Sequence, residues 1–181
     1  MKNNIFKLGM LAFLPVLIIG CFLIVGCGGS KEQIASSSTN QVTSSTSTAK
    51  HYAENGISFD YPNTWGTGNS NSPNAIAALV SQTGAFLVVT KEAMPSGYTL
   101  KIYNDQTVMN MNPTQMMSGT FPTVAGLSAC ESVFKTTDAQ VRTVILEKDN
   151  VAYVIICSSP VATFNNAQIS FNMIVNSFNV Q

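Results

Sequence analysis

Charged side chains are scarce in this sequence of 181 residues. Asp, Glu, Lys and Arg make up only 10% of it, and nine basic residues balance nine acidic ones, so the formal net charge is zero. A typical soluble domain carries about 25% charged residues. Binding to nucleic acid requires a basic stripe that neutralises phosphates. The scattered basic residues therefore argue against nucleic acid as a partner.

The side chains on which most catalytic and metal sites depend are also few. His51 is the single histidine, and no Gly-x-Ser-x-Gly motif is present to position a nucleophilic serine. The sequence also lacks a glycine-rich phosphate loop and the carboxylate spacing of a calcium loop. Met109, Met111, Met116 and Met117 form a cluster whose thioethers can bind Cu(I), although methionine more often fills a core. We expect a protein that is not an enzyme and holds no cofactor or metal, with His51 exposed.

The long hydrophobic run at the N-terminus predicts where the protein is located. Two lysines precede residues 8–26, which are almost wholly apolar and uncharged, as in a secretory signal or a membrane anchor. The run ends in Ile-Val-Gly-Cys at 24–27, which resembles the lipobox of prokaryotic lipoproteins, where the cysteine becomes the lipid-modified N-terminus. We predict a signal peptide over residues 1–26, lipidation at Cys27 and a location on the extracytoplasmic face of the cell membrane. An uncleaved signal anchor, the alternative, gives the same topology.

A polar segment separates this N-terminal region from the rest of the chain. Residues 36–48 are mostly Ser and Thr and contain too little apolar surface to offset the entropy of ordering. We therefore predict that residues 27–50 are the lipidated cysteine and a disordered, Ser/Thr-rich tether. Residues 51–181 are predicted to form one folded domain.

Alternating hydrophobicity and turn residues predict a domain rich in strands. Asp149-Asn150 is a two-residue hairpin signal between the last two strands. Residues 151–158 are apolar on both faces, so this strand needs cover on both sides. The predicted strands are 57–61, 75–82, 85–90, 129–135, 140–148 and 151–158, with 115–123 extended.

Two helices are expected to provide that cover. One spans about 98–111 and is capped by Ser96 or Thr99. The other closes the chain, with Ser159 as N-cap, Pro160 in the first position and phenylalanines recurring at helical spacing. The predicted fold class is therefore α+β, an α/β/α sandwich with a central, mostly antiparallel sheet flanked by helices.

Cys130 and Cys157 are the two cysteines of the predicted domain. The strand 140–148 is expected to lie between theirs, which would place their backbones about 9–10 Å apart, beyond the reach of a disulfide. We expect two buried thiols. A disulfide is the alternative, since an extracytoplasmic location permits one.

Four aromatic residues are candidates to line a pocket. They are Tyr61, Trp65, Tyr98 and Tyr103. The competing interpretation of Trp65, which follows a proline turn, is that it fills the core.

Residues 56–65 follow a G-x-S-F-x-Y-P-x-x-W pattern, residues 141–157 form a predicted series of hairpins, and residues 171–178 follow an F-x-x-I-x-x-S-F pattern. These three stretches resemble the PsbP-like family, which is named after an extrinsic subunit of the photosynthetic oxygen-evolving complex. The resemblance covers residues 52–181. It implies an α/β/α sandwich around an antiparallel sheet and does not imply an enzyme. The lipobox, the tether and the scarcity of charge differ from the photosynthetic members, so a role in oxygen evolution is not implied.

Together these features predict a membrane-tethered, non-enzymatic binding or accessory module, whose partner is a membrane or surface protein complex. The alternative is a carrier or sensor of a small or lipidic ligand, held in a cleft between sheet and helix.

Overall fold

The computed structural model describes residues 48–181. The predicted signal peptide, Cys27 and most of the predicted tether lie outside the described residues. No helix between residues 48 and 181 is long and apolar enough to cross a membrane. The elements are β1 (Ala49–Glu54), β2 (Ile57–Pro62), β3 (Gly66–Thr67), β4 (Ala75–Val80), β5 (Phe86–Ala93), α1 (Leu100–Asn110), β6 (Gln115–Thr120), β7 (Thr123–Val124), β8 (Leu127–Lys135), β9 (Gln140–Lys148), β10 (Val151–Ser159), α2 (Phe164–Ser177) and β11 (Asn179–Val180).

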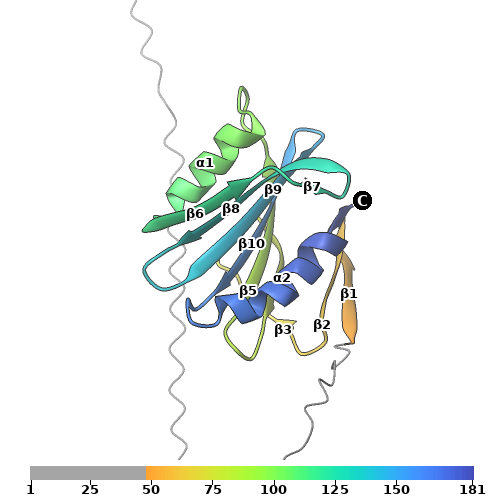
Figure 1. Cartoon of the computed structure of the whole chain (residues 1–181). Helices are drawn as coiled ribbons and strands as arrows, with labels where there is room; N and C mark the ends of the chain where they lie inside the picture. Colours follow the sequence, from red (N-terminus) through yellow and green to blue (C-terminus); the bar gives the residue numbers. More distant parts are fainter. Residues whose placement is uncertain (1–47) are drawn as a thin grey trace, which may run out of the picture.

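A large antiparallel sheet forms the centre of the domain (Figure 1). Its strand order is β3-β4-β5-β10-β9-β8-β6, with β7 paired to β8. β10 lies between β5 and β9, which explains why its sequence is apolar on both faces. Asp149 and Asn150 join β9 to β10 with φ values of 53° and 61°, as a tight hairpin turn of the primed type requires. The predicted hairpin is confirmed.

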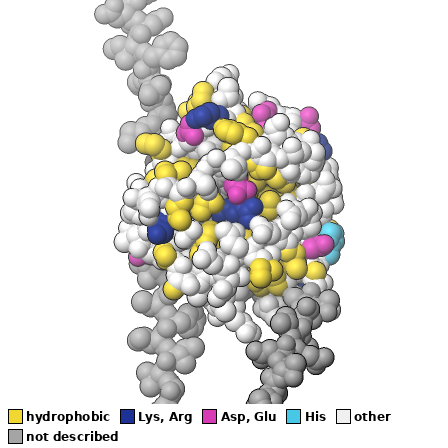
Figure 2. All heavy atoms as spheres, in the orientation of Figure 1, with side chains coloured by type: hydrophobic (Ala, Val, Ile, Leu, Met, Phe, Trp, Pro, Cys, Tyr) yellow, Lys and Arg dark blue, Asp and Glu magenta, His cyan; other side chains and the backbone are white. Residues whose placement is uncertain are grey.

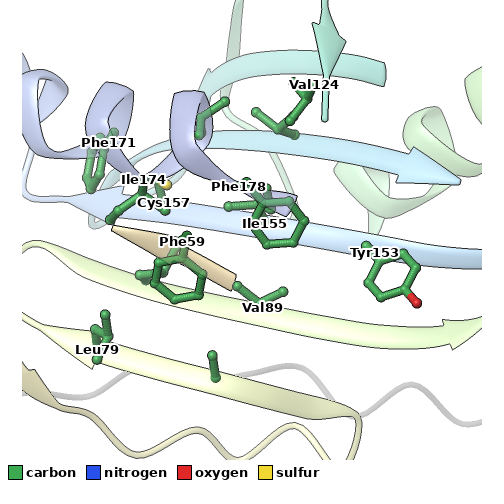
Figure 3. Close-up of a cluster of buried hydrophobic side chains, with 14 of the residues drawn as sticks. Phe59, Leu79, Val89, Val124, Tyr153, Ile155, Cys157, Phe171, Ile174 and Phe178 are labelled. Atoms are coloured by element: carbon green, nitrogen blue, oxygen red, sulfur yellow. The ribbon is translucent and has the colours of Figure 1, made fainter. Parts of the chain in front are cut away.

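Each face of the large sheet is covered by one helix. The main core lies between the sheet and α2, where Phe171 and Ile174 of the helix meet Ile155 and Cys157 of β10 (Figure 3). On the opposite face, α1 buries Tyr103 and Val108 against β8, β9 and β10. The predicted α+β class and mostly antiparallel sheet are confirmed, and the sandwich has one helix on each side.

The structure contains a second, smaller sheet that the sequence does not predict. Its order is β1-β2-β11, and it lies beside α2 (Figure 1). β1 starts at Ala49, inside the segment predicted as tether, and most of its residues are exposed. Backbone pairing with β2 therefore holds β1 in place. Because β1 buries few side chains, its sequence lacks the alternating hydrophobic pattern from which strands are predicted.

The start of the C-terminal helix also differs from the prediction. Ser159 is the last residue of β10 and pairs with Gln140, so it does not cap a helix. Pro160 begins a turn in which its carbonyl accepts the N–H of Thr163, and α2 starts at Phe164. The pairing with β9 extends the strand past the residues that resemble a helix start.

Candidate functional site

The four predicted pocket aromatics do not line a common pocket. Trp65 is 4% exposed and packs against Phe171 of α2, whereas Tyr61 is partly buried beside Phe59 in the same core. Tyr103 is buried on the opposite face of the sheet, where its hydroxyl donates to Glu92 and burial raises the pKa of the phenol. Tyr98 lies before α1 and is 41% exposed. The large sheet separates Tyr103 from Trp65 and Tyr61, and the sequence alone does not show on which side each residue falls.

A cleft of about 210 Å³ does lie beside Trp65, between the β4–β5 turn and the start of α2. We call it the Trp65 cleft; it is lined by Trp65, Ser81, Thr83, Ala85, Thr163, Asn166, Ala167 and Ser170. None of these side chains is charged. Ligand pockets for drug-sized molecules usually measure about 300–1,000 Å³. The Trp65 cleft therefore suits a small neutral group and offers no charge for acid–base or ionic chemistry.

Two hydroxyl pairs fix the walls of the Trp65 cleft. The Oγ of Ser81 accepts the backbone N–H groups of Thr83 and Ala85 and lies 3.0 Å from the Oγ1 of Thr83, which holds the hairpin turn. On the other wall, the hydroxyls of Ser159 and Thr163 are 2.8 Å apart. These hydroxyls are thus already engaged in structural hydrogen bonds.

The single arginine of the chain forms a polar cluster under α2. Arg142 on β9 is 9% exposed and donates from Nη1 to Asn172 (2.6 Å) and Gln168 (3.3 Å) of α2, and from Nη2 to Glu131 of β8 (3.0 Å). Its Nε is buried and has no partner among the described residues. Figure 2 shows a basic and an acidic patch together in the middle of this face, surrounded by hydrophobic side chains. We call Arg142, Glu131, Gln168 and Asn172 the Arg142 cluster. It links α2 to β8 and β9.

His51 lies on the small sheet, opposite Asp60. Its Nδ1 is 2.6 Å from the Oδ1 of Asp60, and the two side chains are 62% and 45% exposed. The nearby hydroxyl of Ser177 accepts the backbone N–H of Asp60 and donates to the carbonyl of Met173. Within residues 48–181, no hydroxyl or thiol is hydrogen-bonded to His51. The predicted exposure of His51 is confirmed.

Cys130 and Cys157 are both free and buried, as expected. Cys130 on β8 pairs with Ile145 and Cys157 on β10 pairs with Arg142, so β9 separates them. Burial raises the pKa of both thiols, that of Cys157 to about 12. At neutral pH they are therefore protonated, which makes them poor nucleophiles and metal ligands.

The methionines do not converge on one site either. Met94 is buried and Met111 is partly buried under α1, whereas Met109, Met116 and Met117 are exposed. Sequence reasoning missed the Arg142 cluster, although one signal was available, since a lone arginine within an apolar strand needs buried partners. Nothing in the sequence singles out Ser81 or Asn166 as cleft residues.

The fold and the site define a small α+β domain with a neutral cleft. The groups considered as reactive candidates have structural surroundings: Cys130 and Cys157 are buried in the core, and His51 contacts Asp60 on the small sheet. The chain belongs to the PsbP-like protein family, whose model matches residues 8–180. No protein with a curated description matches the sequence.

Solved structures show the same fold. The cyanobacterial PsbP protein (CyanoP) of Synechocystis sp. PCC 6803 is similar with a TM-score of 0.57 and 15% identity, over 80% of this chain and 98% of that chain. LpqN of Mycobacterium tuberculosis, described as involved in cell envelope biogenesis, is similar with a TM-score of 0.50 and 15% identity, over 74% of this chain and 90% of that chain. At this identity the similarity establishes the fold alone.

Proposed function

We propose that this protein is a lipoprotein whose PsbP-like domain acts as a non-enzymatic accessory module on the extracytoplasmic face of the cell membrane. Its partner in this proposal is a membrane or surface protein complex. The lipid on Cys27 holds the domain at the membrane, and the Ser/Thr-rich tether gives it freedom to reach that partner.

The main support for tethering is the order of the segments: an uncharged apolar run, the Ile-Val-Gly-Cys box at 24–27, a polar spacer and then a PsbP-like domain. A second support is that LpqN, which has the same fold, is described as involved in cell envelope biogenesis. The accessory role is supported by the use of His51, Cys130 and Cys157 in packing and surface contacts and by the small, neutral Trp65 cleft.

Replacing the lipidation residue tests the anchor. In cells fed a labelled fatty acid, the full chain should incorporate label and sediment with membranes, whereas Cys27→Ser should lose the label and remain unprocessed. Cys21→Ser is the matched control, because Cys21 lies inside the predicted signal peptide and its replacement should change neither result. Equal labelling of the wild-type and Cys27→Ser chains would refute the lipoprotein proposal.

Native purification tests the accessory role. Chemical cross-linking in intact cells, followed by purification of the tagged full chain, should recover a protein partner in stoichiometric amount. Recovery of the domain without protein partners but with a bound small molecule would instead support the second candidate.

The second candidate is a sensor of a small neutral ligand, and the Trp65 cleft favours it. Its volume of about 210 Å³ and neutral lining fit a small polar molecule better than a lipid chain. Trp65 is the only tryptophan, so its fluorescence reports directly on the cleft. A panel of neutral sugars and amides that leaves this fluorescence unchanged at millimolar concentration would count against the candidate.

A further inference from the structure

Strand β6 has an uncharged outer edge, which a single bulge protects in part. Within residues 48–181 five strands have a free outer edge, namely β1, β3, β6, β7 and β11. Proteins usually protect such edges with short strands, charged side chains or bulges. β3, β7 and β11 have two residues each, and β1 carries Lys50 and Glu54. β6 has six residues, none of them charged.

The backbone of β6 is free to pair on its outer side. Among the described elements β6 pairs with β8 alone, from Gln115 opposite Lys135 to Thr120 opposite Glu131. All six residues of β6 are exposed, and α1 packs on β8 and β9 rather than over β6. A bulge between Met116 and Ser118 protects that part of the edge, so the stretch left for regular pairing is Ser118 to Thr120. A row of unpaired N–H and C=O groups fits one kind of occupant, another β-strand.

The side chains along β6 add exposed apolar surface to this edge. Met116 and Met117 are 53% and 49% exposed, and Phe121, directly after the strand, is 71% exposed. Methionine is flexible and adapts to the surface that it meets. The edge therefore offers both backbone hydrogen bonds and adaptable apolar contacts.

The composition of β6 makes it compatible with itself. When two copies of β6 pair antiparallel about a two-fold axis, each residue of one copy lies opposite a β6 residue of the other copy. A residue on the axis lies opposite itself. A charged residue near the axis would then face its own charge and destabilise the pair. β6 presents only Gln, Met, Ser, Gly and Thr, so no such repulsion arises. By contrast, β1 would bring charged side chains into this arrangement.

We propose that β6 pairs antiparallel with β6 of a second copy of this chain, joining the two large sheets into one continuous sheet. Pairing of two six-residue strands buries less than the roughly 1,200 Å² typical of stable complexes. The dimer is therefore weak in dilute solution and forms where the local concentration of the chain is high. This inference does not rest on the lipid anchor or the accessory role.

Cysteine scanning of the full chain tests the pairing. Each residue from Gln115 to Thr120 is replaced singly by cysteine, and cells or membranes are treated with a mild oxidant. Opposite residues in an antiparallel pair lie about 4.5–5.5 Å apart, within disulfide reach, whereas positions away from the axis face a different residue. We expect a single sharp maximum of dimer at one position or two neighbours. Ala53→Cys on exposed β1 is the control and should give only the background of the unsubstituted chain. Uniform cross-linking along β6, or none above that background, would overturn the proposal.

Charge substitutions give a second readout that does not use cysteine. Two differently tagged full chains are expressed together, and the fraction of one that is recovered with the other is measured after mild solubilisation. Ser118→Lys and Ser118→Glu should each lower that recovery about tenfold or more when both copies carry the same charge, and mixing the two variants should restore it. Val80→Lys, at an exposed position away from β6, should leave it unchanged. Equal melting temperatures establish that the variants fold, and unchanged recovery in both Ser118 variants would refute pairing at β6.

Discussion

The Arg142 cluster allows a quantitative prediction about what fastens α2 to the sheet. In the variant Glu131→Gln the shape of the side chain is kept but its charge is lost. Arg142 would then remain under α2 with only neutral acceptors, the amide oxygens of Gln168 and Asn172. The remaining positive charge would have no counter-ion in contact, so the folded state should be destabilised.

The expected size follows from the exposure of the pair. Breaking a fully buried ion pair costs about 3–5 kcal/mol, but the Arg142 and Glu131 side chains are 10% and 20% exposed, so water reaches them and screens part of the charge. The glutamine oxygen can still accept from Nη2 of Arg142, which preserves part of the hydrogen bond. We therefore expect Glu131→Gln to lower the free energy of unfolding by about 1–2 kcal/mol. The double variant Glu131→Leu/Arg142→Met should lose less than the sum of its two single variants, because removing both partners leaves no unpaired charge.

Urea unfolding of the full chain, followed by the fluorescence of Trp65, measures these effects. With a slope of about 2 kcal/mol per molar urea, the midpoint for Glu131→Gln should fall by roughly 0.5–1 M while the slope stays constant. Glu54→Gln on exposed β1 is the matched control and should shift the midpoint little. If Glu131→Gln behaves like this control, or if the two single effects in the double variant simply add, then the ion pair does not fasten α2 as described.

Three further predictions concern packing and pH. Phe171→Ala should lower the free energy of unfolding by about 3–5 kcal/mol, because the ring is fully buried. Ile169→Ala on the same helix should lower it by less than about 0.5 kcal/mol, because that side chain is 76% exposed. Equal urea midpoints for the two variants would contradict the assigned face of α2. Gly68→Ala should lower the melting temperature, because a Cβ at this position would lie 2.7 Å from a ring carbon of Phe86 in β5. Gly66→Ala should leave the melting temperature nearly unchanged, because a Cβ at that position would have no other atom within 4 Å. Burial raises the pKa of Cys157 from 9.0 to about 12, so above pH 9 the unfolded chain loses this proton first, and stability should fall with rising pH by up to about 1.4 kcal/mol per pH unit. Cys157→Ala should remove that contribution, and an identical alkaline slope in variant and wild type would show that the thiol is not its source.

Strong local patterns in the sequence predict much of the large sheet. The two-sided apolar run of β10 and the Asp149-Asn150 turn fix the β9–β10 hairpin and its central place. The small sheet could not be predicted in this way, because β1 is mostly exposed and β11 has only two residues. Their structure depends on pairing with β2, and long-range pairing leaves little local signal.

The site was harder to predict because it depends on which face of the sheet each residue occupies. Tyr103 and Trp65 both look like pocket aromatics in the sequence, yet the large sheet separates them. The Trp65 cleft combines a hairpin turn with the start of α2, two segments about 80 residues apart whose meeting no local pattern records. Free cysteines were predictable because strand order alone keeps Cys130 and Cys157 apart.

The motifs that connect this chain to its family are themselves packed together. The ring centroids of Phe59, in the first motif, and Phe178, in the last, are 6.1 Å apart. The ring centroids of Trp65 and Phe171 are 6.2 Å apart, and the two rings pack edge to face. The two ends of the domain sequence thus form one aromatic core that joins β2 to α2. Substitutions in these motifs would affect folding before they affected binding. Family membership therefore carries information about the core, whereas the two surfaces proposed for binding, the edge of β6 and the Trp65 cleft, lie outside these motif contacts.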